Sequence, residues 1–230
     1  MKIYFLPFAG GSDICYNKLI HNFIKNAIVP VQCSLPGRGG RLGEELLDSI
    51  PALAQDVFRQ ITASFDGGPY AIFGHSMGAS IAVHVLSLLK KSEFPLPVHV
   101  FLSGKSGVVE PDKPPFKCEM SVQDLKNTLS DLGGIPKVLI VDDDFMSFFE
   151  PIIRKDFRAI EHYLPVSFHD SKLKVTVYFS DGDKLSAEDV FAWQRITAEK
   201  IDGKCFSGGH FFIFDHAKEI VKDVLFKLKP

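Results

Sequence analysis

Short apolar runs alternate with stretches of helical spacing along most of the chain. The runs are rich in β-branched or aromatic residues, are bounded by Gly, Pro or Asp as buried strands are, and cover residues 2–6, 29–35, 70–73, 98–102, 173–179 and 204–206. Between them, apolar side chains recur at helical spacing over residues 16–25, 50–64, 77–91, 187–201 and 216–228. This alternation predicts an α/β fold, in which a mostly parallel central sheet is flanked by helices on both faces.

One stretch, residues 108–165, interrupts the alternation. It starts with Pro111, Pro114 and Pro115 and continues with helix-like segments rich in Phe, Leu and Met, without a clear strand. An apolar insertion between two strands is well placed to act as a helical lid over the carboxyl ends of the strands, where the sites of α/β proteins lie. The alternative is that these helices are peripheral packing only.

Length and composition indicate one globular unit. The chain has 230 residues, of which 46% are hydrophobic and 23% charged, as expected for a single domain over residues 1–230 with this insertion. Its 26 basic and 28 acidic side chains leave a formal charge of −2, so no global field would draw it to nucleic acid or to an anionic membrane. No apolar stretch approaches the roughly 18 residues that cross a bilayer. Function must therefore come from a local site.

The cysteines and the N-terminus bear on the compartment. The four cysteines are far apart and form no C-x-x-C motif, which predicts reduced thiols. The N-terminal apolar run is interrupted by Pro7, well short of a signal-peptide core. We therefore expect a cytoplasmic protein.

The strongest local signal is the pentapeptide Gly74-His75-Ser76-Met77-Gly78, which lies between an expected strand and an expected helix. A G-x-S-x-G sequence in this context is typical of a nucleophile elbow, a strained turn whose flanking glycines avoid a clash of Cβ atoms. Ser76 is thus the candidate nucleophile. The free N–H groups at the start of the following helix would face a developing oxyanion, and the amide of Met77 is the natural donor.

A second oxyanion donor is expected in the loop after the first strand. This loop contains Phe8 and Ala9, followed by Gly10 and Gly11. In a hydrolase sheet such a loop lies beside the elbow, so the amide of Phe8 or of Ala9 is the candidate donor. The two glycines could also form only a tight turn.

A serine needs a base and an oriented acid, which follow it along the chain in this type of fold. Of the eight histidines, His210 and His216 come late enough, and His210 is favoured because it lies in a glycine loop after a short strand, whereas His216 suits the start of a helix. The preceding strand ends before Asp181 and Asp183. We prefer Asp183 as the acid and keep Asp181 as the alternative; either aspartate could also simply cap the next helix.

These segments together resemble the type II thioesterases that accompany non-ribosomal peptide and polyketide synthases, a branch of the α/β-hydrolases. The match spans the chain and depends on the motifs L-P-F-A-G-G-S from Leu6, L-P-G-R-G-G-R from Leu35, F-G-H-S-M-G-A from Phe73, V-F-L-S-G from Val100, the loop at Asp181 to Asp183 with Trp193 downstream, and G-G-H-F-F from Gly208. The acid loop departs from the G-x-x-D type usual in the family.

The resemblance implies an enzyme that hydrolyses acyl groups from the phosphopantetheine thiol of acyl or peptidyl carrier domains, editing or unblocking a synthase. It implies carrier domains as partners and no metal or organic cofactor, and we expect a monomer. A flexible lid would cover the acyl channel, so we expect Phe148 and Phe149 to affect chain-length preference. The alternatives are a stand-alone acyl-CoA thioesterase or esterase and, more remotely, a non-catalytic carrier-binding protein.

Two arginines of the second motif leave a choice open. Arg38 and Arg41 could bind phosphate or a carrier surface, or they could brace their own loop by ion pairs.

Overall fold

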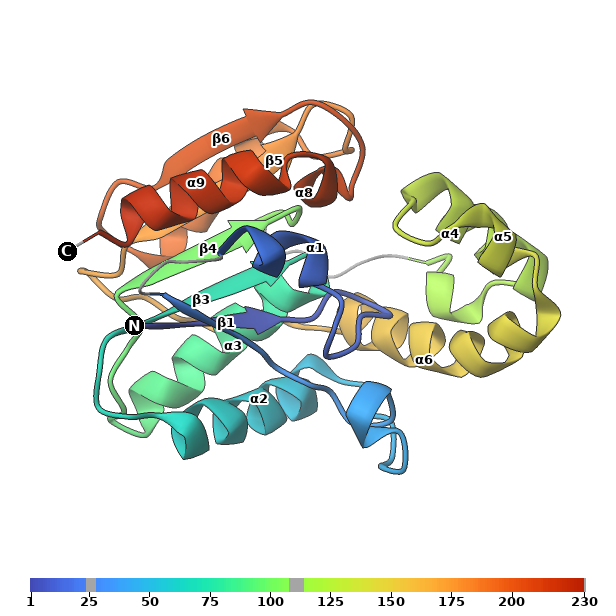
Figure 1. Ribbon diagram of the computed structural model, residues 1–230, viewed down its shortest axis with the longest axis horizontal. Coiled ribbons are helices and arrows are strands. Elements are labelled where there is room, and N and C mark those ends of the chain that lie inside the picture. Colours follow the sequence, from blue (N-terminus) through green and yellow to red (C-terminus); the bar gives the residue numbers. More distant parts are fainter. Residues whose placement is uncertain (24–27, 108–113, 230) are drawn as a thin grey trace.

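A computed structural model describes residues 1–23, 28–107 and 114–229 of the chain. Its centre is a six-stranded sheet in the order β2-β1-β3-β4-β5-β6, in which all neighbouring strands pair in parallel (Figure 1). The strands are β1 (Lys2–Leu6), β2 (Val29–Gln32), β3 (Tyr70–His75), β4 (His99–Ser103), β5 (Val175–Ser180) and β6 (Asp202–Phe206). The predicted parallel α/β sheet is confirmed.

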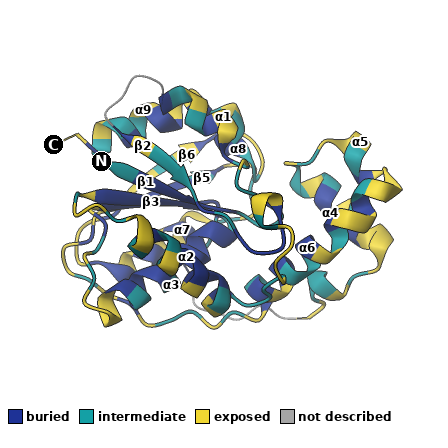
Figure 2. Ribbon diagram, turned by 60° about the horizontal axis from the view of Figure 1, so that its bottom comes forward, coloured by how far each residue is buried: buried dark blue, intermediate teal, exposed yellow. Residues whose placement is uncertain are grey.

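Helices cover both faces of this sheet (Figure 2). One face carries α2 (Ile50–Ser64), α3 (Met77–Lys91) and α7 (Ala187–Phe191), and the other carries α1 (Asn17–Ile20), α8 (Phe212–Asp215) and α9 (Ala217–Lys227). Each face has its own buried apolar cluster, because side chains of a strand point alternately to the two sides. This explains why the strands read as continuous apolar runs.

Two of the expected elements are shorter than the sequence pattern indicated. The strand expected over residues 29–35 ends at Gln32, because Ser34 pairs instead with the Gln60 side chain, which accepts from its amide at 3.1 Å and donates to its carbonyl at 2.7 Å. The helix expected over residues 16–25 is represented by α1, which follows Tyr16, and a 3₁₀ turn, η1 (His21–Phe23), and residues 24 and 25 lie outside the described residues.

A third expected element, a helix, changes from α-helix to 3₁₀ helix midway. Over residues 187–201, the chain forms α7 and then a 3₁₀ helix, η4 (Ala192–Ile196). The change coincides with two anchors to the loop after β4: the indole N–H of Trp193 donates to the carbonyl of Lys105 at 2.9 Å, and Nε of Arg195 donates to that of Gly107 at 3.0 Å. Local helical spacing could not reveal these long-range bonds.

The insertion between β4 and β5 is helical in its described part, residues 114–165. It contains η3 (Lys117–Glu119), α4 (Val122–Leu132), α5 (Lys137–Ile140) and α6 (Asp143–Glu161), and it extends from the end of the sheet at which β1, β3 and β4 finish (Figure 1). Leu125, Leu129, Ile140, Met146 and Phe149 belong to an apolar cluster within the insertion, separate from the two sheet clusters. The expected start at Pro111 lies outside the described residues, as do residues 108–110.

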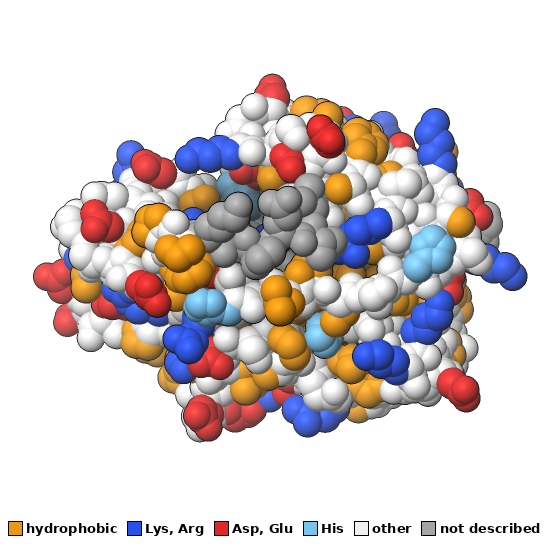
Figure 3. All heavy atoms as spheres, turned by 180° about the vertical axis from the view of Figure 1, so that it is seen from behind, with side chains coloured by type: hydrophobic (Ala, Val, Ile, Leu, Met, Phe, Trp, Pro, Cys, Tyr) orange, Lys and Arg blue, Asp and Glu red, His pale blue; other side chains and the backbone are white. Residues whose placement is uncertain are grey.

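Charged side chains show no segregation on the face in Figure 3, where Lys and Arg lie among Asp and Glu. Within the described parts of the chain, no helix is both long and apolar enough to span a membrane.

Candidate active site

The turn between β3 and α3 has the geometry of a nucleophile elbow. Ser76 adopts φ 54° and ψ −117°, a strained conformation for a residue with a Cβ atom. A Cβ on Gly74 would lie 2.3 Å from the carbonyl oxygen of Gly78, and one on Gly78 would lie 2.2 Å from that of Leu6. Both flanking positions therefore exclude larger residues, for the steric reason expected from the pentapeptide.

Ser76 is held by its backbone and leaves its side chain unused by the helix. Its amide donates to the carbonyl of Ser103 at 2.8 Å, and its hydroxyl makes no capping hydrogen bond to α3. The residue lines a cavity of about 690 Å³, which His210 also lines. The structure therefore brings the candidate nucleophile and the favoured candidate base to one cavity.

The carboxyl ends of β5 and β6 hold the candidate acid and base. Asp183 follows β5, His210 follows β6, and Oδ2 of Asp183 lies 2.7 Å from Nδ1 of His210. Their side chains are 13% and 16% exposed. Burial raises the pKa of Asp183, but the hydrogen bond and charge of His210 and the amide of Lys184 outweigh burial and hold this pKa below its ordinary value. The carboxylate stays ionised and can orient the imidazole.

The two rival residues occupy other places. Oδ1 of Asp181 accepts from the amide of Gly208 at 3.1 Å, so this exposed carboxylate braces the loop that carries His210. His216 lies at the start of α9, where its Nε2 is 3.0 Å from the carbonyl oxygen of Ser207, and it is not among the residues that line the cavity. Neither Asp181 nor His216 is joined to the cavity by these contacts.

The loop after β1 forms a tight turn beside the elbow. The amide of Gly11 donates to the carbonyl of Phe8 at 2.9 Å, and Gly10 adopts φ +75° at the third position, where a type II turn requires glycine. The amide of Gly10 donates to Oδ2 of Asp156 at 2.7 Å. The amides of Phe8, Ala9 and Met77 donate to no group in the described part of the chain, so they are available to a ligand. Phe8 and Ala9 also line the cavity.

The two phenylalanines expected in the insertion lie in different environments. Both are on α6 and line the cavity, but Phe149 is 8% exposed and packs within the insertion's apolar cluster, whereas Phe148 is 52% exposed. The Phe149 ring lies so close to the turn that a Cβ on Gly10 would be 2.5 Å from its Cζ atom. Leu129, Ile153 and other apolar side chains complete a lining suited to a hydrocarbon chain.

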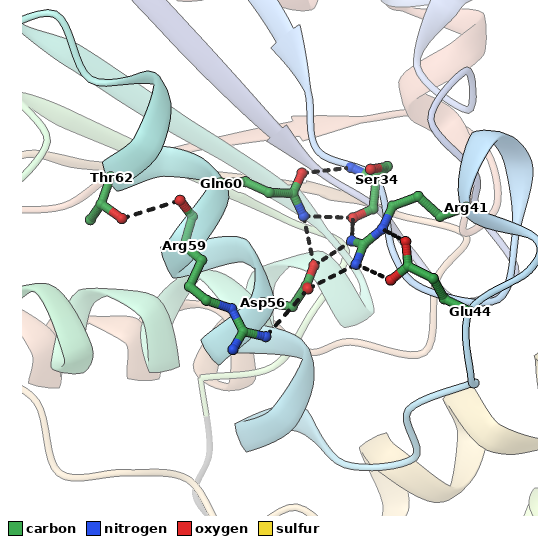
Figure 4. A network of polar contacts seen from close by, with 7 residues as sticks. All are labelled: Ser34, Arg41, Glu44, Asp56, Arg59, Gln60 and Thr62. Atoms are coloured by element: carbon green, nitrogen blue, oxygen red, sulfur yellow. Dashed lines mark hydrogen bonds and ion pairs between the residues drawn. The ribbon is translucent and has the colours of Figure 1, made fainter.

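Both arginines of the L-P-G-R-G-G-R motif make ion pairs with other elements. Arg41 contacts Glu44 and Asp56, as drawn in Figure 4. Arg38 binds both carboxylate oxygens of Asp156 on α6, at 2.5 and 2.8 Å, and the pair is almost completely buried. Arg38 and Arg41 could have bound a phosphate or a carrier surface, or braced their own loop by ion pairs; the contacts in the structure are ion pairs. No motif surrounds Asp156 in the sequence, so sequence reasoning missed this residue.

His75, the second residue of the pentapeptide, is a further neighbour of the site to which the sequence assigned no role. Its Nδ1 lies 2.9 Å from the hydroxyl of Ser103, and its ring centroid lies 5.0 Å from that of His210. Burial, and then the charge of His210, lower the pKa of His75 well below its ordinary value. His75 is thus a neutral ring that lies beside His210.

The possible metal ligands of the described residues are dispersed. In residues 1–23, 28–107 and 114–229, no three His, Cys, Asp or Glu side chains come together in a way that could hold a metal ion.

Comparison with known proteins agrees with this geometry. The sequence profile of the Thioesterase domain matches residues 1–228. The medium-chain S-acyl fatty acid synthase thioesterase of Rattus norvegicus is 28% identical over 214 residues, covering 92% of this chain and 81% of that protein. The phenyloxazoline synthase MbtB of Mycobacterium tuberculosis is 27% identical over 225 residues, which are 95% of this chain but 15% of the synthase.

A solved structure gives the same result at the level of the fold. ClbQ, from the colibactin NRPS/PKS pathway, superposes with a TM-score of 0.89 at 26% identity, covering 99% of this chain and 96% of that one. The resemblance inferred from the motifs is confirmed: the chain is an α/β-hydrolase that belongs to the thioesterase family.

Proposed function

We propose that this protein is a serine thioesterase that releases acyl groups from the phosphopantetheine thiol of carrier domains and so edits or unblocks a non-ribosomal peptide or polyketide synthase. The observation that carries this proposal is the shared cavity: Ser76 and His210 line it together with apolar side chains, at the carboxyl ends of parallel strands, and Asp183 contacts His210 from behind the lining. A hydroxyl nucleophile, an oriented base and a hydrocarbon-compatible chamber are what acyl transfer from a thioester requires.

The chemistry proceeds in two steps. The hydroxyl oxygen of Ser76 attacks the thioester carbonyl while Nε2 of His210 takes its proton, and Asp183 holds the other ring nitrogen and stabilises the imidazolium. The tetrahedral intermediate expels the pantetheine thiolate, which receives the proton from His210. Water, deprotonated by His210, then attacks the serine ester; the free acid leaves and the serine is restored.

Backbone amides would stabilise the intermediate. The amide of Met77 is the first of α3, where the helix dipole favours negative charge, and that of Ala9 or Phe8 would be the second donor. Apart from the thioester and water, each group in this scheme belongs to the chain itself, so the proposed reaction uses no cofactor.

The insertion would cover the acyl chain as a lid within a single domain. Support comes from the position of α6, whose Phe149 and Ile153 face the turn of Gly10 and line the cavity. The exposed ring of Phe148 would lie on the path by which the acyl-pantetheine arm approaches.

Carrier domains are the proposed partners, because ClbQ, which is similar over nearly the whole length of both chains, belongs to an NRPS/PKS pathway. We propose that the protein acts in the cytoplasm as a monomer. The rat relative is named a medium-chain S-acyl fatty acid synthase thioesterase, which keeps simple acyl thioesters among the substrates to be tested.

The deciding experiment is intact mass spectrometry of an acetyl- or butyryl-loaded carrier protein after incubation with wild type or Ser76→Ala. The matching acyl-CoA is run in parallel. We expect wild type to remove the acyl mass from the carrier faster than from CoA, and Ser76→Ala to be slower by about 10⁶-fold if the triad acts as a unit.

Each alternative has its own outcome. Faster cleavage of acyl-CoA than of the loaded carrier would identify a stand-alone acyl-CoA thioesterase. Cleavage that persists in Ser76→Ala would exclude the serine mechanism. Binding of the carrier without any cleavage would favour a non-catalytic carrier-binding protein.

A further inference from the structure

A buried carboxylate joins the insertion to the turn that carries the proposed oxyanion donors. Asp156 on α6 is completely buried, accepts hydrogen bonds from the two terminal guanidinium nitrogens of Arg38, and accepts the amide of Gly10 at 2.7 Å. Asp156 is 118 positions from Arg38 and 146 positions from Gly10 in the sequence, so its side chain links three distant segments.

The contact with Gly10 ties the turn to α6 at one of its backbone amides. The amides of Gly10 and Gly11 are committed to Asp156 and to the carbonyl of Phe8, which leaves the preceding amides of Phe8 and Ala9 to face a ligand. A hydrogen bond to a charged acceptor is stronger than one between neutral groups, so Asp156 is a firm anchor.

The energetics argue that this pair is not needed for stability. Removing two charges from water offsets most of their attraction, and replacing a buried ion pair by apolar residues of similar volume is often neutral or stabilising. The Arg38–Asp156 pair is buried at 3% and 0% side-chain exposure, so it is such a case. What apolar residues could not replace is the acceptor for the amide of Gly10.

We propose that Asp156, held by Arg38, is a positioning residue that sets the oxyanion turn at Phe8–Gly11 for catalysis. The insertion then acts in the chemistry through its helix α6 and does not merely cover the acyl chain. This inference rests on the proposed thioesterase function and deepens it.

The test compares three double variants with an acyl thioester substrate. Arg38→Met/Asp156→Leu removes the charges and the acceptor. Arg38→Met/Asp156→Asn removes the charges but keeps a side-chain oxygen that can accept from Gly10. The matched control, Arg41→Met/Asp56→Leu, removes the ion pair of the motif's other arginine with a buried aspartate, which has no contact with the turn.

We expect Arg38→Met/Asp156→Leu to lower kcat by about 100-fold with little change in KM, since a misplaced oxyanion donor acts on the transition state. Affinity for an acyl-chain boronic acid, which mimics the tetrahedral intermediate, should fall in parallel. The Asn variant should recover most of kcat, and the control should stay within about threefold of wild type. Melting temperatures are measured for every variant.

The proposal is overturned if Arg38→Met/Asp156→Leu folds and keeps wild-type kcat, if the Asn and Leu variants are equally impaired, or if the control loses as much activity. If the Leu variant does not fold, the Asn variant decides: normal boronate affinity with normal kcat supports the proposal, and loss of both in a folded protein overturns it. Ser76→Ala, assayed in the same series, separates failure of the positioning role from failure of the proposed function. Retained activity in this variant would contradict the serine thioesterase mechanism itself.

Discussion

At the scale of single residues, position decides between chemically equivalent side chains. Asp181 and Asp183 are two residues apart, yet one accepts a backbone amide of the loop and the other contacts His210. The sequence favoured Asp183 but left Asp181 open, because the choice depends on where the loop after β6 lies in space.

The first prediction concerns this pair of aspartates. Asp183→Asn should lower kcat by about 10⁴-fold, because the amide would favour the wrong imidazole tautomer and could not stabilise the imidazolium. Asp181→Asn should reduce kcat only slightly and lower the melting temperature, since it weakens the bond to Gly208. Steady-state kinetics and thermal unfolding of both variants check this. A larger kinetic loss in Asp181→Asn would make Asp181 the acid.

The second prediction concerns the pH dependence of stability at Asp56. Burial raises the pKa of Asp56, but hydrogen bonds from Arg41 and Gln60 and the guanidinium charges outweigh it, so the net pKa lies below its ordinary value. A carboxylate with a lowered folded-state pKa stabilises the fold above its unfolded pKa of about 3.9 and loses this contribution as pH falls through the folded value.

The contribution of Asp56 to stability is measured by urea unfolding of wild type and Asp56→Asn at pH 7 and in the acid range. Wild type should have the larger free energy of unfolding at pH 7, and the difference should shrink as pH falls below about 4. A difference that does not change with pH would contradict the assigned pKa direction.

At the scale of elements, the site is assembled by the ends of parallel strands and one inserted helix. The segments after β1, β3, β5 and β6 meet because all strands run the same way, and α6 packs against the first of them. The elements have separable roles, since β3 and α3 hold the candidate nucleophile, β5 and β6 hold the candidate acid and base, and α6 lines the cavity.

The third prediction distinguishes two neighbouring residues of α6. Phe149→Ala should enlarge the cavity, shift kcat/KM toward longer or bulkier acyl chains, and lower the melting temperature, because Phe149 is buried in the insertion's cluster. Phe148→Ala should leave the melting temperature unchanged and affect mainly KM, because this ring is 52% exposed. A series of acyl-CoA lengths combined with thermal unfolding measures both. Unchanged selectivity in Phe149→Ala would make this ring a core residue only.

At the scale of the whole molecule, the apolar interior is divided. The two clusters on either side of the sheet are joined through the strands, whereas the cluster among α4, α5 and α6 is separate. Regions with few buried contacts to the rest of a protein tend to open locally at lower free energy.

The fourth prediction is therefore a difference in hydrogen exchange. Backbone amides of α4 and α5 should exchange faster than those of β3 and α3, and binding of a non-hydrolysable acyl ligand should slow exchange in the insertion most. Hydrogen–deuterium exchange with mass spectrometry reports both. Equal protection of the insertion and the sheet would show that the molecule opens as one unit.

Features that depend on local chemistry could be predicted from the amino-acid sequence alone. Alternating strand and helix periods predicted the parallel sheet, and the glycines around Ser76 predicted a turn in which larger residues clash, because backbone sterics act between near neighbours. The order of serine, acidic residue and histidine limited the candidates to His210 and two aspartates, with His216 as the less favoured base.

Which distant groups meet depends instead on the folded arrangement of the elements. The fold puts Asp183, and not Asp181, on the ring of His210, and it joins Asp156 to Arg38 and to the amide of Gly10. These contacts span 27, 118 and 146 positions, so no local period or motif reports them. They arise because a parallel sheet brings the carboxyl ends of its strands to one edge, where an inserted helix can lie against them.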